Sequence, residues 1–158
     1  MKLLKILLTI IAATLLVAAI VYITRTDPIA IVAGKRLSGN ERPYPSDWSF
    51  SNDYMTIAIE SRPQDPHSVT TLAIVHQGAL YIPAQSGSTK AWTHYVLDEP
   101  RVRLKIGDTV YLARADRVLD LPLADLMASA AIKYPQFAGR DLDDPPPDTW
   151  LFRISQRR

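Results

Sequence analysis

The pattern in this sequence with the clearest chemical meaning is a stripe of three cations. Arg101, Arg103 and Lys105 alternate with aliphatic residues in a segment that predicts a β-strand. Residues two apart in a strand point to the same face, so these three side chains are expected to lie side by side. Such a stripe can bind a phosphate-bearing ligand or the anionic head groups of lipids. A strand face that is only solvated shows the same pattern, and this is the simpler interpretation.

Residue types that hold metals or act as nucleophiles are sparse. The chain has no cysteine, which excludes disulfides, thiolate nucleophiles and cysteine metal sites. His67, His76 and His94 are not spaced as metal ligands, so no metal is expected. The sequence also lacks the Gly-x-Ser-x-Gly motif of serine hydrolases, the phosphate loop and the dinucleotide fingerprint. The residues by themselves therefore predict no catalytic constellation.

The N-terminus predicts a membrane anchor. Residues 6–23 are apolar except for two threonines and one tyrosine, and about 18 helical residues reach across the hydrocarbon core of a bilayer. We expect membrane contact through residues 3–23 and an anchor over residues 1–24. Lys2 and Lys5 precede the apolar run, which favours a cytoplasmic N-terminus. The prediction is a single-pass protein of a bacterial inner membrane with a periplasmic domain. A cleaved signal peptide is the alternative.

The remainder of the chain predicts a linker and one domain. Residues 25–46 are rich in proline and glycine and predict a spacer between membrane and domain. Residues 47–158 are enough for one hydrophobic core. The net charge of +2 is small and the basic residues are scattered, so nucleic acid is not an expected partner.

Hydrophobic periodicity predicts a domain of mainly β-structure. Alternation of apolar and polar residues and the turn residues between them indicate the strands. An unbroken strand is expected over residues 69–76, and Trp48 and Phe50 are expected on one face of a strand. Strands are predicted at 54–60, 69–76, 79–83, 101–106, 109–118 and 150–154, with helices at 90–98 and 123–133. Two hairpins joined by a short helix outline a small antiparallel barrel.

This layout resembles a known superfamily. Ala91-Trp92 in a helix, followed by Pro100 and Val102 at the start of a strand, is similar to the motif of flavin-binding split β-barrel proteins. Within that superfamily, the deazaflavin-dependent nitroreductase-like proteins and the pyridoxamine-phosphate-oxidase-like proteins are the groups it resembles. Tyr134-Pro135 and the closing strand also fit. The resemblance extends over about residues 48–154.

The resemblance implies an α+β fold, namely an antiparallel six-stranded split barrel with two or three short helices, often a homodimer. It implies FMN or a deazaflavin as cofactor. The residues implied for the cofactor phosphate are Ser86, Gly87, Ser88, Thr89 and Lys90, and those implied for the ring or tail are Trp92, Tyr81 and Arg101. Amide donors at a helix N-terminus and the Lys90 ammonium would both favour an anion.

Two hypotheses about function follow. In the first, the protein is a membrane-anchored oxidoreductase in which a flavin or deazaflavin performs the chemistry. In the second, it is a non-catalytic barrel of the cell envelope that lost the cofactor and serves as an interaction or assembly module. A sheet edge or the surface around Trp48 and Phe50 would then be the contact region.

Overall fold

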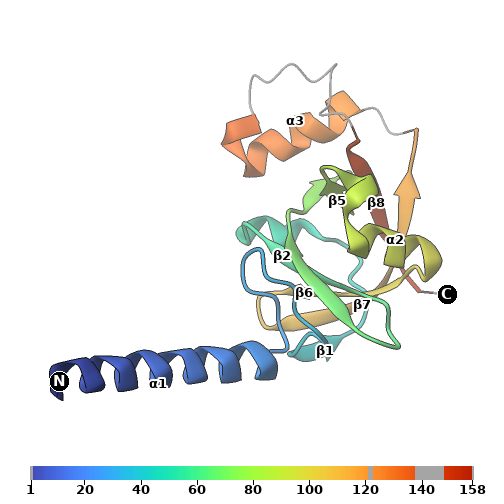
Figure 1. The fold of residues 1–158 in the computed structure, drawn as a ribbon. Helices are drawn as coiled ribbons and strands as arrows, with labels where there is room; N and C mark the ends of the chain where they lie inside the picture. The colour runs from blue at the N-terminus through green and yellow to red at the C-terminus, as the bar shows by residue number, and fades with distance from the viewer. Residues whose placement is uncertain (1, 121–122, 138–147, 158) are drawn as a thin grey trace.

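The computed structural model describes residues 2–120, 123–137 and 148–157 (Figure 1). The helices are α1 (Lys2–Thr24), α2 (Ala91–Asp98) and α3 (Leu123–Lys133), and the 3-10 turns are η1 (Ser49–Asp53), η2 (Gly87–Thr89) and η3 (Pro135–Phe137). The strands are β1 (Asn40–Arg42), β2 (Ile57–Ser61), β3 (His67–Thr71), β4 (Ile74–His76), β5 (Ala79–Ala84), β6 (Arg101–Ile106), β7 (Thr109–Val118) and β8 (Trp150–Ser155).

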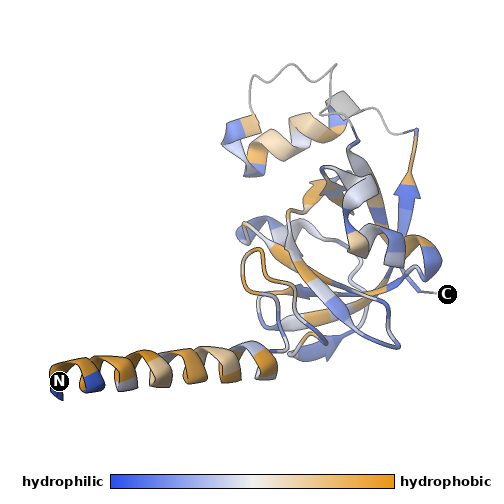
Figure 2. Cartoon of the chain, viewed as in Figure 1, coloured by the Kyte–Doolittle hydropathy of each residue, from blue (hydrophilic) through white to orange (hydrophobic). Residues whose placement is uncertain are grey.

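The helix α1 extends away from the remainder of the molecule and, after Lys5, is mainly apolar on all sides (Figures 1 and 2). Among the described residues it is the one helix long and apolar enough to cross a membrane, with a mean hydropathy of 2.8, and none of that window is buried. The hydroxyls of Thr9 and Thr14 donate to carbonyls four residues earlier, so these polar groups are satisfied within the helix. A membrane anchor and a signal sequence are both consistent with this helix.

One curled sheet forms the barrel, with the strands in the order β3-β2-β6-β7-β8-β5-β4. Neighbours in this order are antiparallel. The short strand β1 is added to β7 in parallel, with Glu41 opposite Val110. A curled antiparallel sheet of the split-barrel kind, with short helices, is thus confirmed, whereas the expected number of six strands is wrong because the described residues form a sheet of eight. The added strands come from residues 40–42 and from a break in one predicted strand.

That break divides residues 69–76 into β3 and β4, which lie at opposite edges of the sheet order. Ala73, at the break, is fully buried and cannot bond its backbone to water. Tyr134 supplies the partners, since its hydroxyl lies 3.2 Å from the Ala73 amide nitrogen and 3.1 Å from the Ala73 carbonyl oxygen. Lys133 Nζ also donates to this carbonyl at 3.1 Å. The prediction of one continuous strand was wrong because the end of α3 replaces the ladder bonds.

Two hydrophobic clusters hold the fold together. The larger fills the barrel and includes Trp48, Ile59, Leu104 and Phe152. The smaller lies between α3 and the β4-β5 hairpin and includes Leu126 and other buried residues, namely Ile74, Tyr81, Ala130, Tyr134 and Leu151. Burying a large aliphatic or aromatic side chain contributes roughly 1.5–3 kcal/mol, so these clusters are the main source of stability.

Trp48 and Phe50 do not share a strand. They flank the start of η1, where their rings stack with centroids 5.9 Å apart. Trp48 is 1% exposed and its indole Nε1 donates to the hydroxyl of Tyr44. The strand prediction for these residues was wrong, because an aromatic cluster with Tyr111 takes up both rings. Trp48 is therefore too buried to contact a partner, whereas Phe50 is 36% exposed.

The segment 25–46, expected as a spacer between membrane and domain, contacts the barrel at several points. Lys105 Nζ donates to the Asp27 carboxylate at 2.6 Å, and Gly34 forms a β-bridge with Ser68. Leu37 is 2% exposed. Proline and glycine here mark bends of a packed chain, because its carboxylates and amides find partners on β2 and β6.

Candidate functional site

The junction between β5 and α2 contains the residues implied for a cofactor phosphate. After β5 the chain turns at Ser86, whose φ of 54° is left-handed, and then forms the 3-10 turn η2. The hydroxyl of Thr93 donates to the carbonyls of Gly87 and Lys90 at 2.6 Å. These bonds tie the first turn of α2 to the junction and fix the backbone of residues 86–90.

The anion that lies at this junction belongs to the chain itself. Ser88 donates its hydroxyl to the Asp148 carboxylate at 2.6 Å and its amide N–H at 3.0 Å. The amide N–H of Gly87 donates to the Asp148 carbonyl at 2.8 Å. The Ser88 hydrogen bond is the main reason that the pKa of Asp148 lies below its ordinary value. A charged acceptor at a helix start is the arrangement that amide donors favour.

The amides of Thr89 and Lys90 also have partners. The Thr89 N–H donates to the Ser86 carbonyl and the Lys90 N–H donates to the Gly87 carbonyl. No space is left above Gly87 either, because a Cβ at this position would overlap the indole of Trp150. The guanidinium of Arg117 covers this indole at 3.7 Å from the ring centroid. A phosphate could therefore bind these donors only by displacing Asp148, and the described junction does not fit a flavin phosphate as it stands.

The remaining residues implied for the cofactor are dispersed. Lys90 is exposed beside the junction. Trp92 is 5% exposed and packs on Phe152 in the barrel core, with ring centroids 5.2 Å apart. Tyr81 is 6% exposed in the cluster beneath α3. Arg101 bonds to both carboxylate oxygens of Glu99. The structure places Ser86 to Lys90 in one loop. Tyr81 and Arg101 do not join that loop in a common site.

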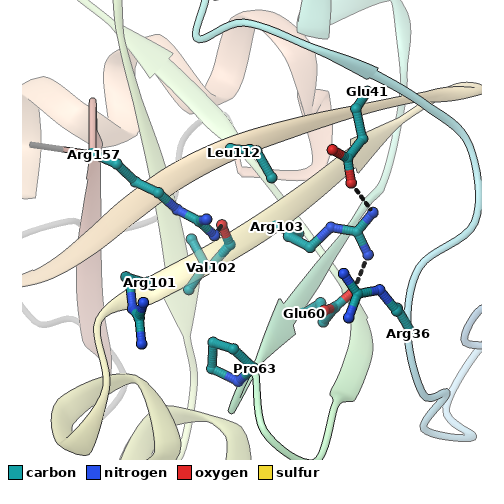
Figure 3. A pocket seen from close by; sticks show the side chains of 9 residues that line it. All are labelled: Arg36, Glu41, Glu60, Pro63, Arg101, Val102, Arg103, Leu112 and Arg157. Atoms are coloured by element: carbon teal, nitrogen blue, oxygen red, sulfur yellow. Dashed lines mark hydrogen bonds and ion pairs between the residues drawn. The ribbon is translucent and has the colours of Figure 1, made fainter.

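A second feature, not predicted as a unit, is a pocket of about 190 Å³ on the outer side of β6 (Figure 3). Arg101 is the one residue in it that the sequence analysis had singled out for a cofactor. Arg103 belongs to the predicted cationic stripe, and the other arginines were missed. The lining consists of Arg36, Glu41, Glu60, Pro63, Arg101, Val102, Arg103, Leu112 and Arg157.

A buried ion network forms one wall of this pocket. Arg103 donates to Glu60 at 2.8 Å and to Glu41 at 2.7 Å. Glu60 is 3% exposed and also accepts the amide N–H of Leu37 at 2.7 Å. Arg103 donates to the Leu37 carbonyl as well. This network joins the 25–46 segment to β2 and β6, because a buried carboxylate requires charge and hydrogen-bond partners.

The described residues contain no group of three or more His, Cys, Asp or Glu side chains that could hold a metal. His67 lies against Tyr95 and its pKa is lowered, mainly by burial. His76 Nδ1 lies 2.9 Å from the Ser129 hydroxyl, and His94 Nε2 lies 2.7 Å from the Ser88 carbonyl oxygen. The three histidines thus occupy separate contacts in the fold.

Comparison with solved structures places this architecture among known folds. A conserved hypothetical protein of Mycobacterium tuberculosis has a TM-score of 0.56 and 18% identity, covering 74% of this chain and 86% of its own. A candidate pyridoxamine 5'-phosphate oxidase of Listeria innocua has a TM-score of 0.52 and 17% identity over 70% and 90% of the two chains. The chain has the split-barrel fold of pyridoxamine-phosphate-oxidase-like proteins.

Other split-barrel structures are also similar to this chain. The heme storage protein HutZ of Vibrio cholerae has a TM-score of 0.53 and 16% identity over 69% of this chain and 86% of its own. No family model matches the sequence, and no curated protein is similar to it at a significant level. At these identities the split-barrel likeness shows the fold alone, and the activity has to be argued from the residues of the site.

Proposed function

We propose that this protein is a membrane-attached split barrel that acts as a binding module of the cell envelope without a flavin at the 86–90 junction. The observation that supports this proposal is the carboxylate of Asp148 on the Ser88 amide and hydroxyl. An internal anion there stabilises the junction in the way that a cofactor phosphate would. The proposal therefore keeps the split-barrel scaffold and assigns its loop donors to the fold.

The proposed location is a bacterial inner membrane, crossed once by α1, with the barrel in the periplasm. Lys2 and Lys5 before the apolar helix support this orientation. The exposed apolar surface of α1 supports its insertion into lipid. A full-length chain fused at its C-terminus to alkaline phosphatase should be active, and the same chain fused to green fluorescent protein should be dark. The opposite pair of results would place the barrel in the cytoplasm.

The absorption spectrum of the purified full-length chain in detergent tests the cofactor part of the proposal. We expect no flavin or deazaflavin absorption, and no binding when FMN or a deazaflavin is titrated in. A yellow protein that releases flavin on denaturation would overturn the proposal.

Sedimentation in the same detergent measures whether the chain is the homodimer that the resemblance implies.

The second candidate function is the flavin-type or deazaflavin-dependent oxidoreductase. It is favoured by the split-barrel fold and by the exposed ammonium of Lys90 next to a loop of small residues. In that case Asp148 would leave Ser88 when the phosphate binds, and Lys90 would provide a charge-assisted contact. Replacing Lys90 by Ala should then weaken cofactor binding, whereas under the first proposal it should change nothing.

A further inference from the structure

We propose that the arginine pocket on the outer side of β6 binds a single phosphate group. This site is distinct from the 86–90 junction, because no residue of that loop lines it. Figure 3 shows Arg101 and Arg157 on one side of the pocket and Arg36 on the other, with Arg103 between them. The group bound is either inorganic phosphate, or a small phosphate ester, or the phosphate of a lipid head group.

The first argument is charge. Four arginines and two glutamates line the pocket, which leaves an excess of two positive charges in the lining. Glu99 lies outside the lining and pairs with Arg101, so one positive charge is still not compensated. Arg36 forms no ion pair with any described residue. A guanidinium offers five N–H donors in a planar fork that matches the oxygens of a phosphate.

The second argument is that two of the four cations cannot move apart. Arg157 donates through Nε to the Ala113 carbonyl at 2.9 Å and through Nη2 to the Val102 carbonyl. Arg103 is fixed by Glu60, Glu41 and Leu37. The fold thus holds Arg157 close to Arg103, and because both glutamates of the lining pair with Arg103, Arg157 has no ion-pair partner among the described residues.

The charge environment of Arg157 and an Arg103 nitrogen without a partner also support a phosphate site. The pKa of Arg157 is lowered, first by burial and then by the nearby charges of Arg101 and Arg103, although Glu41 and Glu60 act in the opposite direction. The Nε of Arg103 is buried without a hydrogen-bond partner among the described residues. Buried polar atoms are rarely left without a partner in a folded protein. A phosphate oxygen in the pocket would reduce the repulsion and add acceptors.

The size of the pocket limits the ligand. Sites for drug-sized molecules and cofactors usually measure roughly 300–1,000 Å³, and this pocket measures about 190 Å³. It has room for one phosphate group but not for a flavin or a nucleotide base beside it. Arg36 belongs to the segment that follows α1, the proposed membrane helix. The phosphate of a lipid head group is therefore a suitable ligand, as is a soluble phosphate.

The test uses the full-length chain in dodecyl maltoside, a detergent that carries no phosphate group. Inorganic phosphate is titrated in calorimetrically, with chloride at equal ionic strength as reference. We expect saturable binding that weakens about tenfold in Arg36→Gln and in Arg101→Gln, since each removes a charge-assisted contact. The Arg36 side chain forms no hydrogen bond or ion pair with the described residues, so its substitution should leave folding unchanged, as circular dichroism would check.

Two matched controls keep the test specific. Arg42→Gln changes an exposed arginine of the same segment that does not line the pocket. Arg114→Gln removes an exposed ion pair with Asp116, similar to the Arg101–Glu99 pair but outside the pocket. Both variants should bind phosphate as the unaltered chain does. Equal weakening by the controls would mean a diffuse charge effect and would overturn the site.

Nanodiscs that contain phosphatidylglycerol distinguish the two sources of phosphate. If the ligand is a lipid head group, these discs should raise the thermal midpoint of the barrel, and Arg36→Gln should abolish the increase while Arg42→Gln retains it. Saturable binding of inorganic phosphate with no lipid effect identifies a soluble ligand. The proposal is wrong if neither probe produces an effect that depends on Arg36.

Discussion

The Asp148 carboxylate accepts both the hydroxyl and the amide N–H of Ser88, at 2.6 and 3.0 Å. These two residues are separated by 60 positions in the chain. Their contact joins the start of β8 to the turn before α2, next to the indole of Trp150 that covers Gly87. A loop that resembles a cofactor site in sequence is thereby closed by the protein's own anion.

Neutralising Asp148 should loosen this junction without creating a flavin site. In Asp148→Asn we expect the Ser88 amide to lose protection from hydrogen exchange, because a neutral acceptor forms weaker bonds than a carboxylate. FMN should bind no better than to the unaltered chain. Asp116→Asn is the control, since Asp116 also accepts a serine hydroxyl, from Ser155. Flavin binding that appears in Asp148→Asn alone would favour the oxidoreductase instead.

The same contact predicts a pH dependence. The pKa of Asp148 is lowered in the folded state, so its contribution is complete above the ordinary value of 3.8 and is lost as the pH falls through the lowered folded pKa. The Ser88 amide resonance should therefore shift only in strong acid. Asp148→Asn should remove this shift. A transition near pH 6 would point to a different group.

The exposed Glu99–Arg101 pair predicts a second pH dependence. The hydrogen bonds from Arg101 lower the pKa of Glu99 to about 2. Any stability from this carboxylate is present above its ordinary pKa of 4.5 and is lost as the pH falls toward 2. NMR titration should give a Glu99 pKa near 2 in the unaltered chain and a higher pKa in Arg101→Gln, because only the backbone N–H of residue 101 is then left as a donor. Arg114→Gln should leave it unchanged, and a Glu99 that titrates normally in the unaltered chain would show that the pair does not persist in solution.

Removing Arg103 should destabilise the barrel strongly. Arg103→Met leaves the buried Glu60 carboxylate without its ion-pair partner, which typically costs about 3–5 kcal/mol. Urea unfolding of the full-length chain in detergent measures the loss. Adding Glu60→Gln should restore a large part of it, because the uncompensated charge is then gone. Arg114→Met, which breaks an exposed pair, should cost less than about 1 kcal/mol.

Removing the Tyr134 hydroxyl should weaken the attachment of α3. This hydroxyl bonds the Met55 carbonyl at 2.9 Å and the backbone of Ala73. In Tyr134→Phe the buried backbone of Ala73 loses a partner, and we expect a loss of about 1–3 kcal/mol in unfolding free energy. Tyr95→Phe is a suitable control, because Tyr95 contacts its neighbours through the ring. Equal stability of both variants would show that water replaces the hydroxyl.

The local features of this protein followed from the sequence. Apolar length defined α1, which ends at Thr24. Alternation of side chains and the turn at Gly107 predicted β6 and β7, and the stretch from Ala91 to the proline at position 100 predicted α2. These elements are determined by interactions between residues that are near in the chain, so the local pattern of apolar and polar residues predicts them.

Tertiary structure decided the features that matter for function. Residues 69–76 read as one strand, yet they divide at Ala73 because Tyr134 and Lys133 bond the backbone there. The sequence also had no signal that Asp148 would reach Ser88, or that Arg36 and Arg157 would line one pocket with Arg103 between them. Such contacts depend on how the sheet curls, since charges distant in the chain interact only after the fold has brought them together.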